Sequence, residues 1–116
     1  MLLIQFGHND EKADSPGGYA DPAQYAQNLA AYAGEAQAAG ALPVLVTPLT
    51  RRRFDPDGRL QHSHGPYPEA CRRAARSAGA PCIDLTDASR RLVEALGDAR
   101  SRALYMVLPA GVYPAW

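Results

Sequence analysis

The sequence predicts an α/β fold built on a parallel sheet. Three short apolar segments alternate along the chain with three segments of helical periodicity, the pattern of βαβ units with right-handed crossovers. The 116 residues suffice for one hydrophobic core, and 47% hydrophobic against 21% charged residues argues against disorder. We therefore expect residues 1–116 to form one α/β unit with about three strands and three helices.

The first strand is expected at about Leu2–Phe6, an apolar run that we expect to be buried on both faces. Gly7, His8, Asn9 and Asp10 follow it, at the strand end where open parallel sheets bind ligands. A glycine permits a sharp turn, and Asp10 is placed to hold that turn by accepting from backbone amides. Asn9 offers a neutral N–H donor of the kind that stabilises an oxyanion. The alternative is an ordinary polar turn.

The first helix is expected to begin with Asp21 as its N-cap, Pro22 at the first helical position and Gln24 as the reciprocal capping residue. Gly40 ends it. The residues expected on its buried face recur at helical spacing: Tyr25, Leu29, Tyr32 and Ala36.

The second strand is expected at Leu42–Thr47, and the second helix at Pro68–Ala78 with Gly79 after it. Between them, residues 55–58 read Asp-Pro-Asp-Gly, a turn sequence. A third strand is expected at Pro81–Leu85 and a third helix at Asp87–Leu96, ending at Gly97. The expected apolar face of the third helix consists of Ala88, Leu92, Val93 and Leu96.

Three parallel strands are few for an independent fold, because such sheets need helices on both faces. The first two helices are expected on one face, and only the third could cover the other. The pattern also starts directly at Met1, which leaves an unpaired edge strand. We therefore expect a piece of a larger domain, with self-association through the bare sheet and the edge near Leu2.

The charges balance, with 12 Lys and Arg against 12 Asp and Glu, so we expect neither a nucleic-acid partner nor an anionic membrane. No apolar run approaches the roughly 18 residues of a membrane span. Cys71 and Cys82 are interpreted as small buried hydrophobic residues, too few for a disulfide framework. No metal or cofactor is expected. We expect no leader peptide before the first strand, and the cellular location stays open.

Two polar clusters admit a functional and a structural interpretation. His62-Ser63-His64 could ligate a metal or place a base beside Ser63, but no Cys or carboxylate completes a zinc set, which favours a polar surface loop. Arg51-Arg52-Arg53 could hold the carboxylate of an acidic sugar, or one arginine could pair with an acidic loop residue while the others stay solvated. The aromatic residues Tyr105, Tyr113 and Trp116 could stack on sugars or cover apolar surface.

Residues 3–10, Leu-Ile-Gln-Phe-Gly-His-Asn-Asp, resemble the third sequence block of SGNH (GDSL-type) hydrolases, most closely the rhamnogalacturonan acetylesterase branch. The resemblance extends in order through almost the whole chain. Its further segments are Val46-Thr47-Pro48, residues 51–58, Tyr67-Pro68-Glu69-Ala70, Ile83-Asp84-Leu85, Leu96-Gly97 and Leu108-Pro109-Ala110-Gly111.

The resemblance implies a three-layer α/β/α fold with a flavodoxin-like parallel sheet, present here in part. It implies a metal-free serine esterase that removes acetyl or similar groups from carbohydrate. Asn9 then matches an oxyanion-hole residue, and Gly7 matches the residue that positions it. Apart from the resemblance, His8 beside Asn9 and Arg52 of the arginine run are candidates for substrate binding. Acetylated carbohydrate or another small ester is the expected partner.

The nucleophile segment Gly-Asp-Ser and the segment Asp-x-x-His, which supplies the base in this family, do not occur in the 116 residues. We therefore expect the fragment alone to be inactive. The alternatives are a non-catalytic carbohydrate-binding or pseudoenzyme module with the same fold, and a truncation without a function of its own.

Overall fold

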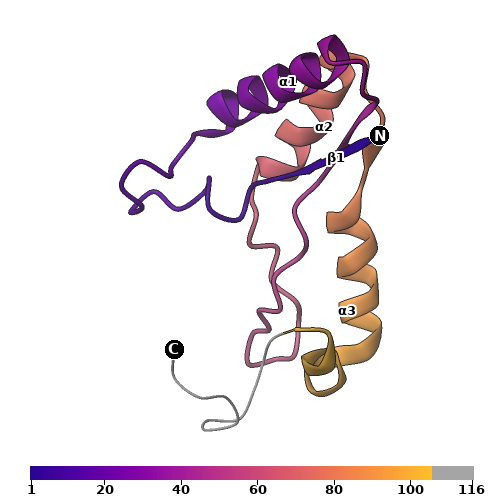
Figure 1. Cartoon of the computed structure of the whole chain (residues 1–116). Helices are drawn as coiled ribbons and strands as arrows, with labels where there is room; N and C mark the ends of the chain where they lie inside the picture. The colour runs from indigo at the N-terminus through magenta and orange to yellow at the C-terminus, as the bar shows by residue number, and fades with distance from the viewer. Residues whose placement is uncertain (106–116) are drawn as a thin grey trace, which may run out of the picture.

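The computed structural model describes residues 1–105, and it confirms the α/β class with three parallel strands and three helices (Figure 1). The elements follow the chain as β1 (Leu2–Gln5), α1 (Pro22–Ala38), β2 (Pro43–Val46), α2 (Tyr67–Ala78), β3 (Cys82–Ile83), α3 (Leu85–Ser101) and a 3₁₀ turn (Arg102–Leu104). The strand order is β1-β2-β3, with Leu2 opposite Pro43. Residues 108–111, Tyr113 and Trp116, named above, lie outside the described residues.

Helix α1 begins where the sequence predicts. The Asp21 carboxylate accepts from the backbone N–H groups of Ala23 at 2.9 Å and Gln24 at 2.8 Å, so it caps the first turn. The Gln24 side chain donates to Asn28 instead of closing the reciprocal cap. Helix α2 ends as predicted, at Gly79 in the left-handed conformation.

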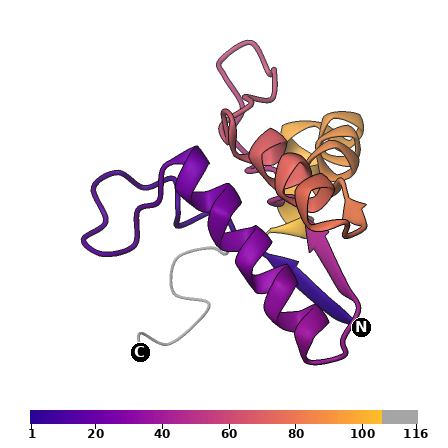
Figure 2. The same cartoon turned by 90° about the horizontal axis from the view of Figure 1, so that it is seen from above.

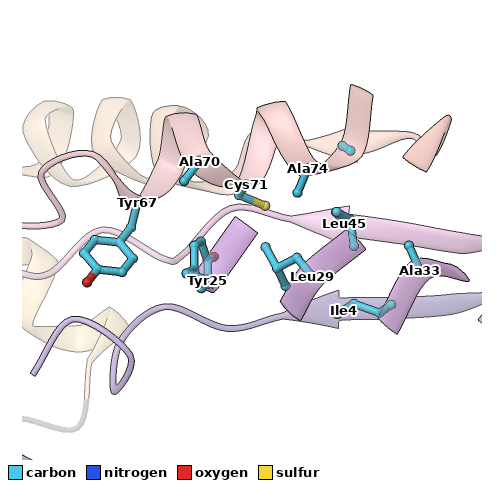
Figure 3. Packing of buried hydrophobic residues seen from close by; sticks show 10 residues of the cluster. Ile4, Tyr25, Leu29, Ala33, Leu45, Tyr67, Ala70, Cys71 and Ala74 are labelled. Atoms are coloured by element: carbon cyan, nitrogen blue, oxygen red, sulfur yellow. The ribbon is translucent and has the colours of Figure 1, made fainter. Parts of the chain in front are cut away.

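The hydrophobic core lies between the sheet and helices α1 and α2, which cover the same face (Figure 3). Its members come from two strands and both helices: Ile4, Tyr25, Leu29, Ala33, Leu45, Tyr67, Ala70, Cys71, Ala74 and Ala75. The prediction that Tyr32 belongs to the buried face is wrong, because Ala33 lies one turn after Leu29 and takes that place. Tyr32 lies on the flank of α1, where its ring meets that of Phe6.

Burial of the first strand on both faces is also a wrong prediction. Ile4 is buried, but Leu2 is 47% and Leu3 58% exposed. The reason is the position of β1 at the edge of the sheet, whereas the central strand β2 is buried along its whole length. This exposed edge is the surface through which we expect self-association, which stays a prediction.

Helix α3 is attached mainly by polar contacts with the segment that follows β2. The Thr86 N–H donates to the Thr47 hydroxyl at 2.9 Å, and the Thr50 N–H donates to the Ser89 hydroxyl at 3.0 Å. Of the four residues predicted to form its apolar face, Val93 is buried, whereas Leu92 is 51% exposed.

The remaining differences concern residues on β3 and α3. Ala88 is exposed and Leu96 is only partly buried, so the predicted apolar face of α3 is not a core face. Cys82 is exposed, unlike the buried Cys71, because β3 is a two-residue edge strand. Gly97 interrupts α3 with a φ of 69°, at the predicted helix end, and helical structure then resumes to Ser101.

The loop that follows β1 projects beyond the start of α1, as the view from above shows (Figure 2). One hydrogen bond joins the two ends of the loop, and a second holds the loop to α2. The Ala20 N–H donates to the Asp10 carbonyl oxygen at 2.9 Å, and the Tyr67 hydroxyl donates to the Ala20 carbonyl oxygen at 2.8 Å. The polar cluster at the end of β1 is therefore anchored to α2.

Candidate functional site

The turn after β1 depends on Gly7. Its φ of +128° is rare for residues with a side chain, and its N–H donates to the Asp10 carboxylate at 2.9 Å. This bond is the turn-holding contact that the sequence predicts for Asp10. A Cβ on Gly7 would lie 3.1 Å from Pro48 Cγ and 3.3 Å from the Tyr25 hydroxyl. The packing around the turn therefore leaves little room for a side chain at this position.

Asn9 lies at the exposed tip of this turn. Lys12 Nζ donates to Asn9 Oδ1 at 2.9 Å. An ammonium group only donates, so the amide atom that faces it must be the oxygen, and this fixes the orientation of the carboxamide. Both N–H donors of Asn9 are thereby left without a protein partner within residues 1–105.

Asn9 lines a hollow of about 330 Å³ at the carboxyl end of β1. The hollow is formed by the end of the strand, the turn and one residue after β2: Gln5, Phe6, Gly7, His8, Asn9, Asp10 and Leu49. The structure therefore brings three of the sequence-predicted site residues, Gly7, His8 and Asn9, to one place.

His8 is partly buried beside Asn9, with its ring edge-on to the His64 ring at a centroid distance of 4.7 Å. Burial lowers the pKa of His8 below its ordinary value of 6.5, and electrostatic interaction with His64 and Arg51 lowers it further. The lowered pKa favours the uncharged imidazole. A neutral imidazole can donate and accept one hydrogen bond each, which suits contact with a sugar hydroxyl.

A largely buried network of polar side chains holds the turn in place. Glu11 forms an ion pair with Arg51, and its other carboxylate oxygen lies 3.2 Å from His64 Nδ1. His64 Nε2 donates to the Leu49 carbonyl oxygen at 2.7 Å, and Arg51 donates to the His8 carbonyl oxygen at 3.0 Å. The network thus ties the turn to the segments after β2 and before α2.

This network corrects the interpretation of the His62-Ser63-His64 segment as a surface loop. His64 is only 4% exposed, because its imidazole fills the space between Glu11 and Leu49. His62 is exposed, so the two imidazoles do not converge. Sequence reasoning missed Glu11 and His64 as partners, since 53 positions separate them and no local pattern links them.

Arg52 lies away from this site. Its guanidinium donates to the Asp98 carbonyl oxygen at 2.9 Å and to the Ser101 hydroxyl at 3.2 Å, pairs with the Asp98 carboxylate, and lies over the Phe54 ring. The structure does not bring Arg52 next to Asn9. Its neighbour Arg51 is the arginine that reaches the turn.

Within residues 1–105, no three His, Cys, Asp or Glu side chains gather in an arrangement able to hold a metal ion. In the same part of the chain, no helix combines the length and the apolar character needed to cross a membrane.

We expect the pH dependence of stability to report the environment of His8. Its folded pKa lies below the unfolded value of 6.5, so below that pH the unfolded chain binds more protons and the free energy of unfolding falls. Arg51, Lys12 and His64 oppose protonation, whereas Glu11 favours it. His8→Gln should lessen the drop in thermal midpoint between about pH 7.5 and about pH 5.5.

The matched control for that measurement is His62→Gln, which removes an exposed histidine. It should leave the pH dependence of the midpoint unchanged. Equal slopes for the wild-type chain and His8→Gln would contradict the assignment.

Comparison with curated proteins identifies relatives along nearly the whole chain. No protein-family model matches it. The chain is 41% identical over 113 residues to rhamnogalacturonan acetylesterase RhgT of Bacillus subtilis, a match that covers 97% of this chain and 47% of the relative. It is 29% identical over 107 residues to the probable rhamnogalacturonan acetylesterase YesY of the same organism, covering 91% of this chain and 49% of the relative. The chain thus spans about half the length of the curated relatives it matches.

Among solved structures, the fold is similar to the crystal structure of protein YxiM from Bacillus subtilis. The TM-score is 0.69 at 23% sequence identity, with 90% of this chain and 29% of the other covered. At this identity the likeness concerns the fold alone, and it supports the α/β assignment. The sequence matches support the rhamnogalacturonan acetylesterase-like family for this chain.

Proposed function

We propose that this chain supplies part of the active site of a carbohydrate esterase that removes acetyl groups from a polysaccharide. In this proposal, Asn9 donates a hydrogen bond to the oxyanion that forms when the acetyl carbonyl is attacked. The observation that carries it is the fixed carboxamide of Asn9, whose oxygen is held by Lys12 while its N–H donors have no protein partner in the described chain. The relatives named as rhamnogalacturonan acetylesterases support the choice of acetyl group and polymer.

The role proposed for Asn9 requires only a hydrogen-bond donor held in the right position. When a nucleophile attacks the carbonyl carbon, the π electrons move to the oxygen, and a donor already aimed at that oxygen stabilises the charge without reorganising. A neutral amide does this without transferring a proton. One such donor lowers the free-energy barrier of an acyl transfer by about 2.7–4 kcal/mol. The Gly7–Asp10 bond keeps the turn that presents Asn9 in one conformation.

The other parts of such a site are not found in this sequence. A serine needs a base within hydrogen-bond reach to act as a nucleophile, and neither Gly-Asp-Ser nor Asp-x-x-His occurs here. His64 cannot serve as that base, because its ring nitrogens face Leu49 and Glu11. The 116 residues alone are therefore proposed to be inactive.

The test is an esterase assay of the purified chain with 4-nitrophenyl acetate and with acetylated rhamnogalacturonan. We expect acetate release no faster than from the Asn9→Ala variant, because the nucleophile and base that start the reaction are lacking. Turnover by the wild-type chain that Asn9→Ala abolishes would falsify the proposed inactivity.

The second candidate is a carbohydrate-binding module with the same fold and no reaction of its own. The observation that favours it is a basic hollow next to the turn, lined by Lys12, Arg51 and Arg53. The two candidates differ in one respect: only an esterase segment should support turnover when it replaces the matching 113 residues of RhgT.

A further inference from the structure

A second hollow, of about 490 Å³, is lined in part by Glu11 and Lys12, which follow the turn. Three chain segments line it: residues 11–12 of the turn, residues 51 and 53 after β2, and residues 63–67 at the start of α2. Lys12 is common to both places, since it lines this hollow and also donates to Asn9 Oδ1. A molecule in the second hollow would therefore lie next to whatever occupies the first.

The lining carries an excess of positive charge. Lys12, Arg51 and Arg53 face one carboxylate, that of Glu11, which already pairs with Arg51 and His64. Lys12 and Arg53 are exposed, and neither has an ion-pair partner among residues 1–105. The whole chain is electrically neutral, so this excess is local.

The start of α2 adds to the same field. The amino end of a helix carries a partial positive charge, and no side chain caps this one. Pro66 and Pro68 have no N–H, and the Tyr67 N–H donates to the His64 carbonyl oxygen at 3.1 Å. The helix therefore contributes electrostatic potential, while the hydrogen-bond donors come from the lysine and the arginines.

We infer that this second hollow binds the carboxylate of a uronic acid residue in the polysaccharide, next to the sugar whose ester lies at Asn9. The inference rests on the proposed function, which brings a carbohydrate to this edge of the sheet. The forked guanidinium of Arg53 matches the two oxygens of a carboxylate, and Lys12 adds a point charge. Arg51 is held by Glu11 and by the His8 carbonyl oxygen, so it contributes charge from a fixed position.

The test is a calorimetric titration of the purified chain with trigalacturonate and, in parallel, with its fully methyl-esterified form. The ester keeps the sugars and removes the charges, so we expect only the free acid to bind. Lys12→Ala and Arg53→Ala should each weaken binding by about fivefold, as loss of one exposed ionic contact does. Added NaCl should weaken binding further, because the contacts lie at the surface.

The matched control is Arg73→Ala, which removes one exposed positive charge from α2 outside this hollow and should leave the affinity unchanged. Lys12 and Arg53 are exposed, so their alanine variants should keep the wild-type thermal midpoint. Three results would each overturn the inference: no binding of trigalacturonate, equal binding of the methyl ester, or equal affinity of the wild-type and Arg53→Ala chains. Displacement by inorganic phosphate at equal concentration would indicate a general anion site and would also overturn it.

Binding and turnover are separate measurements here. A negative titration leaves the role proposed for Asn9 untouched, since that role is measured as a rate. An unaltered rate after loss of Asn9 would likewise leave a positive titration standing as evidence of carboxylate binding.

Discussion

Gly7→Ala is expected to lower the free energy of unfolding by about 2–4 kcal/mol. Two effects add. The backbone at Gly7 has a φ of +128°, which a side chain makes unfavourable, and the new methyl group would lie 3.1 Å from Pro48 Cγ and 3.3 Å from the Tyr25 hydroxyl. Tyr25 cannot yield freely, because its hydroxyl donates to the Phe6 carbonyl oxygen and its ring lies in the core. Urea denaturation of the purified chain measures the change.

Two further glycine variants separate these effects. Gly58 has a φ of +76°, but a methyl group added there would meet nothing within 4 Å, so Gly58→Ala reports backbone strain alone. Gly34 lies in α1 with no positive φ and open space around it, so Gly34→Ala should stabilise the chain by about 0.5–1 kcal/mol. A cost for Gly7→Ala no larger than that for Gly58→Ala would mean that the turn is not closely packed.

Asn9→Ala is expected to lower kcat about 10²–10³-fold in a graft in which this chain replaces the matching segment of RhgT. The two sequences are 41% identical over the 113 residues that the graft exchanges. A donor to the oxyanion acts only once the tetrahedral state forms, so the loss should appear in kcat while KM changes little.

Asn9→Asp tests whether the N–H donors of Asn9, and not only its shape, are needed for turnover. It keeps the shape of the side chain, removes both N–H donors and places a negative charge near the oxyanion, so its kcat should fall at least as far as that of Asn9→Ala. Asn28→Ala is the matched control, since Asn28 lies on α1, where its side chain contacts Gln24. It should keep the kcat of the unmodified graft.

Local signals in the sequence predict where most elements lie. The Asp21-Pro22 start of α1 and the Gly79 end of α2 depend on contacts within a few residues, and both are found as expected. Burial depends on neighbours distant in sequence. Leu3 is apolar but lies on an edge strand, and Leu92 has helical spacing but is 51% exposed. Periodicity alone therefore overestimates the core.

The same distinction applies to the candidate site. The bond from the Gly7 N–H to Asp10 spans three residues and follows from turn chemistry. The contact of His64 with Glu11 spans 53 residues, and only the folded chain brings the two together. Arg51 and Arg52 are neighbours in sequence but reach different partners, Glu11 and Asp98, which no residue pattern distinguishes.

We propose that the Asn9 carboxamide, at the tip of the turn after β1, donates to an oxyanion in an ester-cleaving site. The steady-state kcat of the RhgT graft on acetylated rhamnogalacturonan, measured with and without Asn9→Ala, tests it most directly. We expect an active graft whose kcat falls at least about a hundredfold on this substitution. An active graft that keeps its kcat within a few-fold after Asn9→Ala would contradict the claim.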